Sequence, residues 1–157
     1  MRSVTGVRRA LFAAVLVMAT VTGAQNSSTR DTDAVRRAAL DYVEGFYEGD
    51  TAKLVRALRP EMYKYGFWRD SATSPYRGSQ MTFAQALAYA NRVKARNTPA
   101  PASAPKTVQV LDVMDQTASV KLTAQWGIDY LLLAKYDGRW MISHVLWQGP
   151  HAASTSR

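Results

Sequence analysis

The dipeptide Asp137-Gly138 constrains the fold more than any other stretch of this chain, because it joins two long apolar runs, residues 120–136 and 139–148. Asp-Gly between two strand-like runs predicts a β-hairpin with a type I′ turn, whose two central residues both need a positive φ. The C-terminal part of the chain is therefore expected to form an antiparallel sheet.

A two-residue turn also fixes which residues of the two strands face each other. The pairs are Tyr136 with Arg139, Ala134 with Met141, Leu131 with His144, and Asp129 with Leu146. Because side chains alternate between the faces of a sheet, Asp129 and His144 share one face as diagonal neighbours, with Cα atoms roughly 7–8 Å apart. This acid and imidazole predict a general base or proton shuttle in an apolar pocket. The alternatives are a satisfied polar pair that stabilises the sheet, or an Asp129 at the rim that binds a backbone amide.

Residues 1–24 have the features of a Sec signal peptide. Arg8 and Arg9 precede an apolar run at 10–21, and Ala24 ends a stretch of small residues of the kind that signal peptidase cleaves. An uncleaved anchor is the alternative, but about twelve apolar residues are few for a bilayer. The chain has no cysteine, which excludes disulfides and a lipoprotein-type anchor. We expect cleavage after Ala24, a periplasmic or secreted protein, and no stable membrane anchor after cleavage.

Charge and the scarcity of metal ligands argue against other function classes. The formal net charge is +8, but the lysines and arginines form no block along the chain, so we expect no nucleic-acid partner. One of the two histidines, His151, falls in residues 149–157, which are expected to form a disordered tail. With His144 as the one usable imidazole, no cysteine and no dinucleotide-type glycine loop, we expect neither a metal site nor a cofactor.

The N-terminal half predicts helices. Residues 25–32 are polar and are expected to form a flexible leader before an N-cap. Apolar residues at steps of three and four then predict a helix from Asp33 to about Glu48. Asp50 is expected to cap a second helix, which Pro60 stops.

Thr82 and Gln85 form the pattern of a capping box and predict a third helix, which the proline-rich residues 97–105 end. Between the second and third helices, residues 61–80 combine aromatic side chains with turn formers. They predict either a short edge strand and loop over the mouth of a cavity, or a loop whose rings plug one end of the core.

Beyond residue 105 the apolar period changes to two, which predicts strands at 107–114 and 119–136. Within the longer run the apolar positions move from even to odd numbers, and Gly127 is expected to form a bulge that bends the strand. Three helices followed by antiparallel strands predict an α+β fold, with a curved antiparallel sheet wrapped around the N-terminal helices.

Several stretches resemble the nuclear transport factor two-like superfamily, a cone-shaped α+β fold with a bent sheet around a long helix. Residues 48–60 are similar to its Gly-Asp-x-x-x-Leu-x-x-x-Leu-x-Pro opening, and residues 137–142, Asp-Gly-Arg-Trp-Met-Ile, resemble its Asp-Gly-x-Trp-x-Ile hairpin. Residues 129–131 and 145–147 resemble the branch labelled putative lumazine-binding. The resemblance covers residues 33–148, which we expect to form one domain.

The resemblance implies a pocket but does not specify a reaction, and we expect one of three functions for this protein. The first is an exported, non-enzymatic small-molecule-binding or interaction domain whose apolar pocket is polarised by Asp129 and His144. The second is an isomerase-, dehydratase- or cyclase-like enzyme with one of that pair as general base. The third is a structural dimerisation module.

The expected ligand is small and apolar or aromatic. Candidate ligand-binding residues are Tyr63, Tyr65, Trp68, Trp126, Leu131, Ile142 and Leu146. The sheet face opposite Asp129 is rich in apolar residues, and an exposed apolar face of that size predicts a homodimer through the sheet. The alternative is that the C-terminal tail covers this face.

Overall fold

The structure is a computed structural model that describes residues 10–150, with side chains from residue 28 onward. Within that range it has helices α1 (Ala10–Glu48), α2 (Thr51–Ala57) and α3 (Phe83–Arg96). The strands are β1 (Leu58–Trp68), β2 (Arg77–Met81), β3 (Lys106–Val113), β4 (Thr117–Ala124), β5 (Gly127–Tyr136) and β6 (Arg139–Gln148). The predicted α+β class is confirmed.

The expected signal peptide, residues 1–24, lies outside the part of the chain whose side chains are described, and so does most of the expected tail at 149–157. Among the described residues, no helix combines the length and apolar character needed to span a bilayer.

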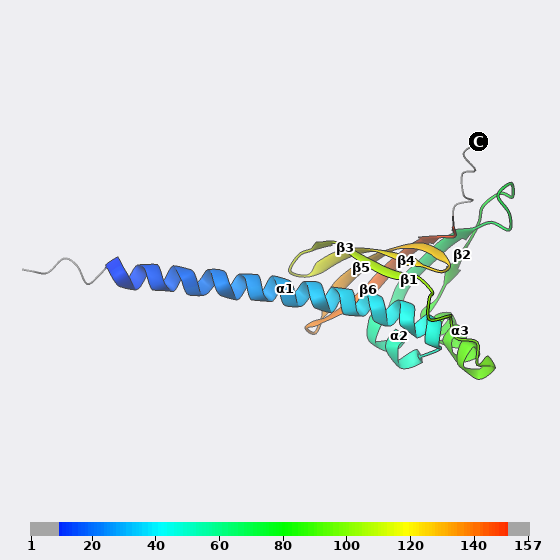
Figure 1. The fold of residues 1–157 in the computed structure, drawn as a ribbon, viewed down its shortest axis with the longest axis horizontal. Helices are drawn as coiled ribbons and strands as arrows, with labels where there is room; N and C mark the ends of the chain where they lie inside the picture. The colour runs from blue at the N-terminus through cyan, green and yellow to red at the C-terminus, as the bar shows by residue number, and fades with distance from the viewer. Residues whose placement is uncertain (1–9, 151–157) are drawn as a thin grey trace, which may run out of the picture.

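One sheet contains all the described strands, in the order β2-β1-β6-β5-β4-β3. β1 runs parallel to β6, and the other neighbouring strands are antiparallel. Figure 1 shows α1 crossing one face of this sheet, with α2 and α3 on the same side. We call this face the inner face and the opposite one the outer face.

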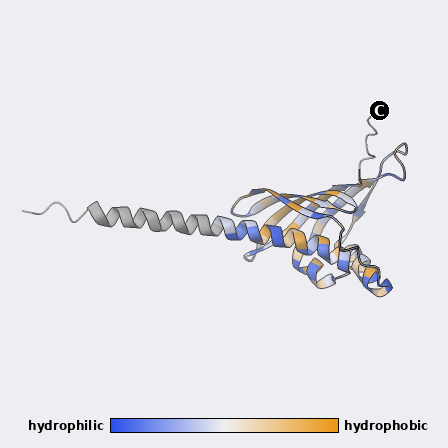
Figure 2. Ribbon diagram, in the orientation of Figure 1, coloured by the Kyte–Doolittle hydropathy of each residue, from blue (hydrophilic) through white to orange (hydrophobic). Residues whose placement is uncertain are grey.

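The core lies between α1 and the inner face. Val35, Ala39, Tyr42 and Val43 of α1 have no exposed surface, and neither do Leu122, Leu131 and Ile142 of the sheet. Hydrophobic and hydrophilic residues are interspersed along the helices and strands (Figure 2), as expected for elements with one face buried. Burial of each large apolar side chain contributes about 1.5–3 kcal/mol, so this layer provides most of the stability of the fold.

The caps predicted for the two shorter helices are confirmed. The Asp50 carboxylate accepts hydrogen bonds from the backbone N–H groups of Ala52 at 2.8 Å and Lys53 at 3.2 Å. Thr82 and Gln85 form the reciprocal capping box at the start of α3. Each cap satisfies amide groups that have no partner within the helix.

Helix α1 continues through residues 25–32, where the sequence predicted a flexible leader and a helix start near Asp33. The reason is a tertiary contact that local polarity does not show. The Asp31 carboxylate accepts hydrogen bonds from Trp140 Nε1 at 2.9 Å and Lys135 Nζ at 2.8 Å, and these tie this turn of the helix to β5 and β6.

Residues 61–80 contain more β structure than either alternative predicted. β1 lies inside the sheet between β2 and β6, and β2 is the edge strand beside it. Along β1, Met62 and Lys64 point inward and are buried, whereas Tyr63 and Phe67 point outward and are exposed. Tyr63, Tyr65 and Phe67 therefore alternate with the inward residues of β1 and do not plug the core.

The bulge predicted at Gly127 is wrong. The chain turns through Gln125 and Trp126 and reverses, so that Ala124 pairs with Gly127 and the run at 119–136 becomes two antiparallel strands. Gly127 has a φ of 130°, and a Cβ there would lie 2.0 Å from the carbonyl oxygen of Gln148. The change of apolar phase along this run reflects that turn.

The Asp137-Gly138 turn is confirmed, with φ values of 49° and 76° and Tyr136 opposite Arg139. The predicted pairing holds as far as Leu133 with Ile142 and then shifts by one residue, so that Leu132 faces His144.

Ser143 is the extra residue, and it forms a β-bulge in β6. Beyond it, Leu131 faces Val145 and Asp129 faces Trp147, which corrects the two predicted pairs furthest from the turn.

Candidate functional site

The bulge at Ser143 separates the two residues of the predicted catalytic pair. Asp129 lies on the inner face with no exposed surface, whereas His144 lies on the outer face and is exposed. His144 Nδ1 lies 3.2 Å from the hydroxyl oxygen of its neighbour Ser143. Because one inserted residue turns every following side chain to the other face, the predicted pair does not form.

The inner face opens instead into a cavity of about 460 Å³ beside α3 and the β1–β2 hairpin. Four aromatic rings line it, from Phe46, Tyr89, Trp126 and Trp147. Its other lining residues are Lys64, Ser79, Gln80, Met81, Gln85, Ala88 and Arg92. The lining contains two cationic side chains and no carboxylate.

Four polar side chains are joined in a hydrogen-bonded network at this cavity, whose wall includes Lys64 and Trp126. Lys64 Nζ donates to the Tyr42 hydroxyl at 2.6 Å, and that hydroxyl donates to Asp129 Oδ2 at 2.7 Å. Trp126 Nε1 donates to Asp129 Oδ1 at 2.8 Å, and Lys64 Nζ lies 3.9 Å from Oδ2. Each oxygen of the carboxylate therefore has a donor, which is the condition for burying it.

These groups come from α1, β1, the β4–β5 turn and β5, and the sheet register explains their approach. Lys64 pairs with Val145 of β6, and Val145 pairs with Leu131 of β5. Asp129 lies two residues before Leu131 and points to the same face. Lys64 and Asp129 are therefore inward residues of strands that flank β6, and Tyr42 of α1 bridges them from above.

Burial pushes both ionisable groups toward their neutral forms. It raises the pKa of Asp129, while the Lys64 charge and the hydrogen bonds from Tyr42 and Trp126 act in the opposite direction. Burial likewise lowers the pKa of Lys64, with the Asp129 charge opposing it. The pKa of Tyr42 is well above its usual value, because of its burial and the nearby carboxylate.

Aromatic rings surround the amino group of Lys64. Its Nζ lies 5.3 Å from the ring centroid of Tyr42, 5.8 Å from that of Phe46 and 5.4 Å from that of Trp147. Gly66 makes room for the last ring, because a Cβ at that position would lie 1.7 Å from Trp147 Nε1. The glycine is thus required for the wall of the cavity.

The structure places one of the predicted ligand-binding residues, Trp126, on the cavity wall. Trp68 does not line the cavity but stacks on the cavity residue Trp147, with ring centroids 6.4 Å apart. The other predicted residues lie elsewhere: Leu131 and Ile142 are fully buried in the core, and Tyr63, Tyr65 and Leu146 belong to the outer face.

Among the polar residues of the buried network, Lys64 and Tyr42 are the two that sequence reasoning missed. A signal for Lys64 did exist, since period-two alternation along residues 58–68 places it on the same face as Met62 and Gly66, away from its exposed tyrosine neighbour Tyr63. A lysine on the apolar side of a strand is unusual, because lysine is almost never buried without a partner. Tyr42 lies on the apolar face that residue spacing predicts for the helix at 33–48, and it is fully buried in the core.

Metal binding has no support among the described side chains, where no group of three or more His, Cys, Asp or Glu residues could hold an ion.

Solved structures show the same fold at low sequence identity. An NTF-2 like protein of unknown function from Silicibacter pomeroyi DSS-3 is 15% identical with a TM-score of 0.60, covering 78% of this chain and 98% of that one. An NTF2-like protein of unknown function from Methylobacillus flagellatus KT is 19% identical with a TM-score of 0.59, covering 77% and 93%. An NTF2-like protein with a cystatin-like fold from Novosphingobium aromaticivorans is 10% identical with a TM-score of 0.60, covering 86% and 92%.

No curated protein matches this chain. The model of the family described as "Putative lumazine-binding" matches residues 30–148. That match begins one residue before Asp31, which anchors α1 to the sheet, and it ends with β6. The chain therefore belongs to the putative lumazine-binding family of NTF2-like proteins.

Proposed function

We propose that this protein binds a small planar aromatic compound with a carbonyl oxygen in the cavity beside α3. The observation that carries the proposal is Lys64, a buried lysine in the wall of a cavity that four aromatic rings also line. Its hydrogen bond goes to Tyr42, and an amino group has more than one N–H to donate. A ligand oxygen that enters the cavity can accept a hydrogen bond from a second N–H of Lys64.

The walls fit a flat ring system. Trp126 and Trp147 offer indole surfaces, and the volume of about 460 Å³ lies within the range of small-molecule sites. Lumazine, the compound in the family description, is a planar bicyclic heterocycle with two carbonyl oxygens, so it is the first probe to use. Lys64 would hold one carbonyl, while stacking and apolar burial hold the rings.

A fluorescence titration with lumazine tests this, because two of the tryptophans line the cavity. Replacing Lys64 by Met keeps the length of the side chain and removes the donor. Loss of a hydrogen bond from such a group costs about 1.5–3 kcal/mol, so we expect affinity to fall about 10- to 150-fold.

The matched control is Lys94→Met, which removes an exposed lysine from α3 and is expected to leave affinity unchanged. Circular dichroism is used to check that both variants are folded. Equal affinity of the Lys64 variant and the wild type, or no lumazine binding at all, would refute the proposal.

We also propose a homodimer through the outer face. Tyr130, Leu132 and Leu146 are about half exposed there, and so is Tyr63 of β1. They are contiguous, because Tyr130 pairs with Leu146, while Leu132 and Tyr63 both pair with His144. An apolar patch of this kind in an antiparallel face suits an isologous contact, in which each copy presents the same surface.

Sedimentation at micromolar concentration measures this association. Leu132→Asp places a charge in the middle of the patch and should yield a monomer. Leu111→Asp is the matched control, because Leu111 is also half exposed but lies on the edge strand β3. A wild-type protein that sediments as a monomer contradicts the dimer.

The features of residues 1–24 support a third proposal, that they direct export and are cleaved after Ala24. N-terminal sequencing of the protein recovered from the periplasm should begin at Gln25. Recovery of the intact N-terminus from the cytoplasm would refute export.

A further inference from the structure

We propose that Lys64 is a nucleophilic amine that forms an imine with aromatic aldehydes or ketones that enter the cavity. The inference rests on the proposed function in one respect, since the carbonyl compound has to occupy the same cavity. It goes further in assigning a covalent step to a named atom, Lys64 Nζ.

A continuous chain of hydrogen bonds leads from this nitrogen to a carboxylate. Lys64 Nζ donates to the Tyr42 hydroxyl at 2.6 Å, and the hydroxyl donates to Asp129 Oδ2 at 2.7 Å. A proton can pass from the ammonium group to the tyrosine oxygen while the tyrosine proton passes to the carboxylate. Tyr42 is unchanged at the end, Lys64 is a neutral amine and Asp129 is a neutral acid.

Burial favours that neutral arrangement. Tyr42 and Asp129 have no exposed surface, and Lys64 is 5% exposed. Removal of two charges from water costs several kcal/mol per ion, and at 3.9 Å the Lys64 and Asp129 charges are not in direct contact. The amine thus becomes neutral without moving charge to any exposed group, and a neutral amine is what attacks a carbonyl.

Lys64 also lies on the side of the network where a ligand would enter. Lys64 lines the cavity, whereas Asp129 lies behind it and is not part of the lining. An aromatic aldehyde stacked against Trp126 or Trp147 would present its carbonyl group to Nζ. The ring surfaces that surround Nζ keep bulk water away from the product, which slows hydrolysis of the imine.

The step balances within the site. The nitrogen lone pair forms the new bond to the carbonyl carbon, and the electron pair of the C=O double bond moves to oxygen. The oxygen leaves as water with two protons, and the nitrogen loses two. The proton held on Asp129 can move through Tyr42 to the departing oxygen. A proton released by Lys64 Nζ then replaces it on Asp129. No oxidant or reductant is needed.

Reductive trapping tests the inference on the full-length chain. The protein is incubated at pH 7 with benzaldehyde and sodium cyanoborohydride, which reduces an imine to a stable amine, and the modified lysines are identified by peptide mass spectrometry. An ordinary exposed lysine is neutral in about one molecule in 2,500 at this pH. We expect the Lys64 adduct to form at least about tenfold faster than the adduct of the exposed Lys94.

Lumazine is a competitor without an aldehyde, and it should slow labelling of Lys64 while leaving Lys94 unaffected. Tyr42→Phe keeps the ring and breaks the proton path, so labelling of Lys64 should fall toward the rate at Lys94. Labelling of Lys64 no faster than Lys94 in the wild type overturns the inference. If Lys64 is labelled rapidly and lumazine does not slow the labelling, the proposed function is wrong and the imine inference is not. If Lys64 is labelled rapidly in a folded Tyr42→Phe variant, the proton path through Tyr42 is wrong.

Discussion

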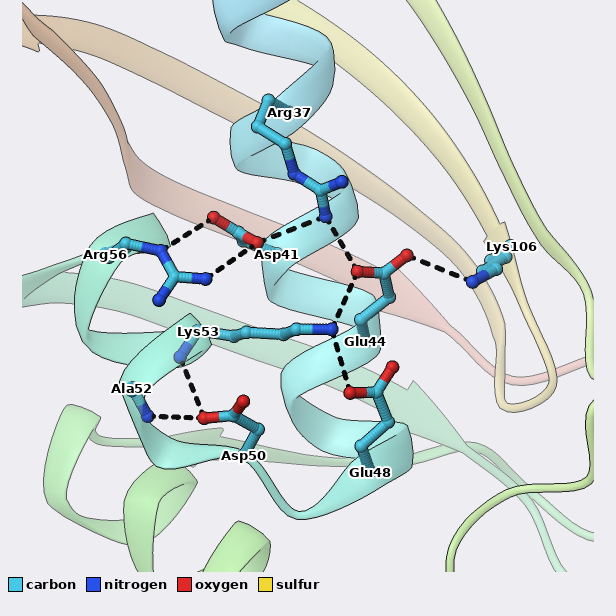
Figure 3. A network of polar contacts seen from close by, with 9 residues as sticks. All are labelled: Arg37, Asp41, Glu44, Glu48, Asp50, Ala52, Lys53, Arg56 and Lys106. Atoms are coloured by element: carbon cyan, nitrogen blue, oxygen red, sulfur yellow. Dashed lines mark hydrogen bonds and ion pairs between the residues drawn. The ribbon is translucent and has the colours of Figure 1, made fainter.

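Glu44 offers the sharpest test of how the helices are held together. Its carboxylate lies on α1 where α2 and β3 meet it, and three cations surround it (Figure 3). Arg37 approaches to 2.7 Å, and Lys53 and Lys106 each approach to 3.0 Å. One carboxylate thus links α1 to both of its neighbours, and Glu44→Gln removes its charge while nearly preserving its shape.

The magnitude follows from the pKa of Glu44. Burial acts to raise it, but the hydrogen bonds from Lys106, Lys53 and Arg37 outweigh burial and lower it from 4.5 to about 2. At about 1.4 kcal/mol per pKa unit, this shift corresponds to about 3 kcal/mol. Arg37 and Lys106 are about half exposed, so solvent screens part of that, and we expect Glu44→Gln to cost about 1–2 kcal/mol at pH 7.

The sign of the pH dependence is fixed by the direction of the shift. A carboxyl with a lower pKa in the folded than in the unfolded chain stabilises the fold above about pH 4.5, and that contribution is lost as the pH falls toward 2. The difference in unfolding free energy between wild type and Glu44→Gln should therefore shrink over this interval.

Urea unfolding at a series of pH values, followed by tryptophan fluorescence, measures the unfolding free energies of wild type and Glu44→Gln. Glu61→Gln is the control, since Glu61 pairs with Arg59 at 3.0 Å but is 71% exposed, and it should cost less than about 0.5 kcal/mol. A Glu44 effect equal to that of Glu61, or one that does not change between pH 7 and pH 3, would show the reasoning to be wrong.

Two further substitutions test the close approach of Gly127 to β6 and the anchoring of the N-terminal part of α1 by Asp31. Gly127→Ala should destabilise the protein by more than Gly138→Ala in urea unfolding: both glycines have a positive φ, but only at Gly127 would the new Cβ meet a neighbour, the Gln148 carbonyl. Equal costs would mean that this contact is unimportant. Asp31→Asn should weaken its hydrogen bonds to β5 and β6, with a cost of about 1 kcal/mol, and should speed amide hydrogen exchange in residues 28–34 of α1; unchanged exchange there would show that Asp31 does not anchor the helix.

Features decided by nearby residues could be predicted from the sequence. Asp50 and Thr82 cap helices because their side chains reach amides two or three residues away. The Asp137-Gly138 turn forms because its two residues accept positive φ. The buried face of α1 follows from apolar spacing alone. In each case the determining contact lies within a few residues, so the pattern in the chain contains the information.

Features decided across the sheet could not be predicted in the same way. The bulge at Ser143 is not encoded by a glycine or a proline, and it is visible only in the pairing of β6 with β5. The hydroxyl of Ser143 donates to the Leu132 carbonyl at 3.1 Å, which satisfies that group beside the shift. The N-terminal extent of α1 likewise depends on Asp31 and Trp140, which are 109 residues apart.

That one inserted residue has a larger effect than the loss of the expected acid-imidazole pair. Without it, the pairing predicted from the turn would continue, and Leu146 instead of Trp147 would stand opposite Asp129. With it, Val145 and Trp147 point inward, and Trp147 packs over Gly66 and along the wall of the cavity. His144 and Leu146 correspondingly turn outward into the apolar patch. The bulge therefore builds both surfaces at once, and its removal should damage ligand binding and association together. Deleting Ser143 should lower lumazine affinity and dimer stability in parallel, whereas loss of one without the other would show that the two faces are specified independently.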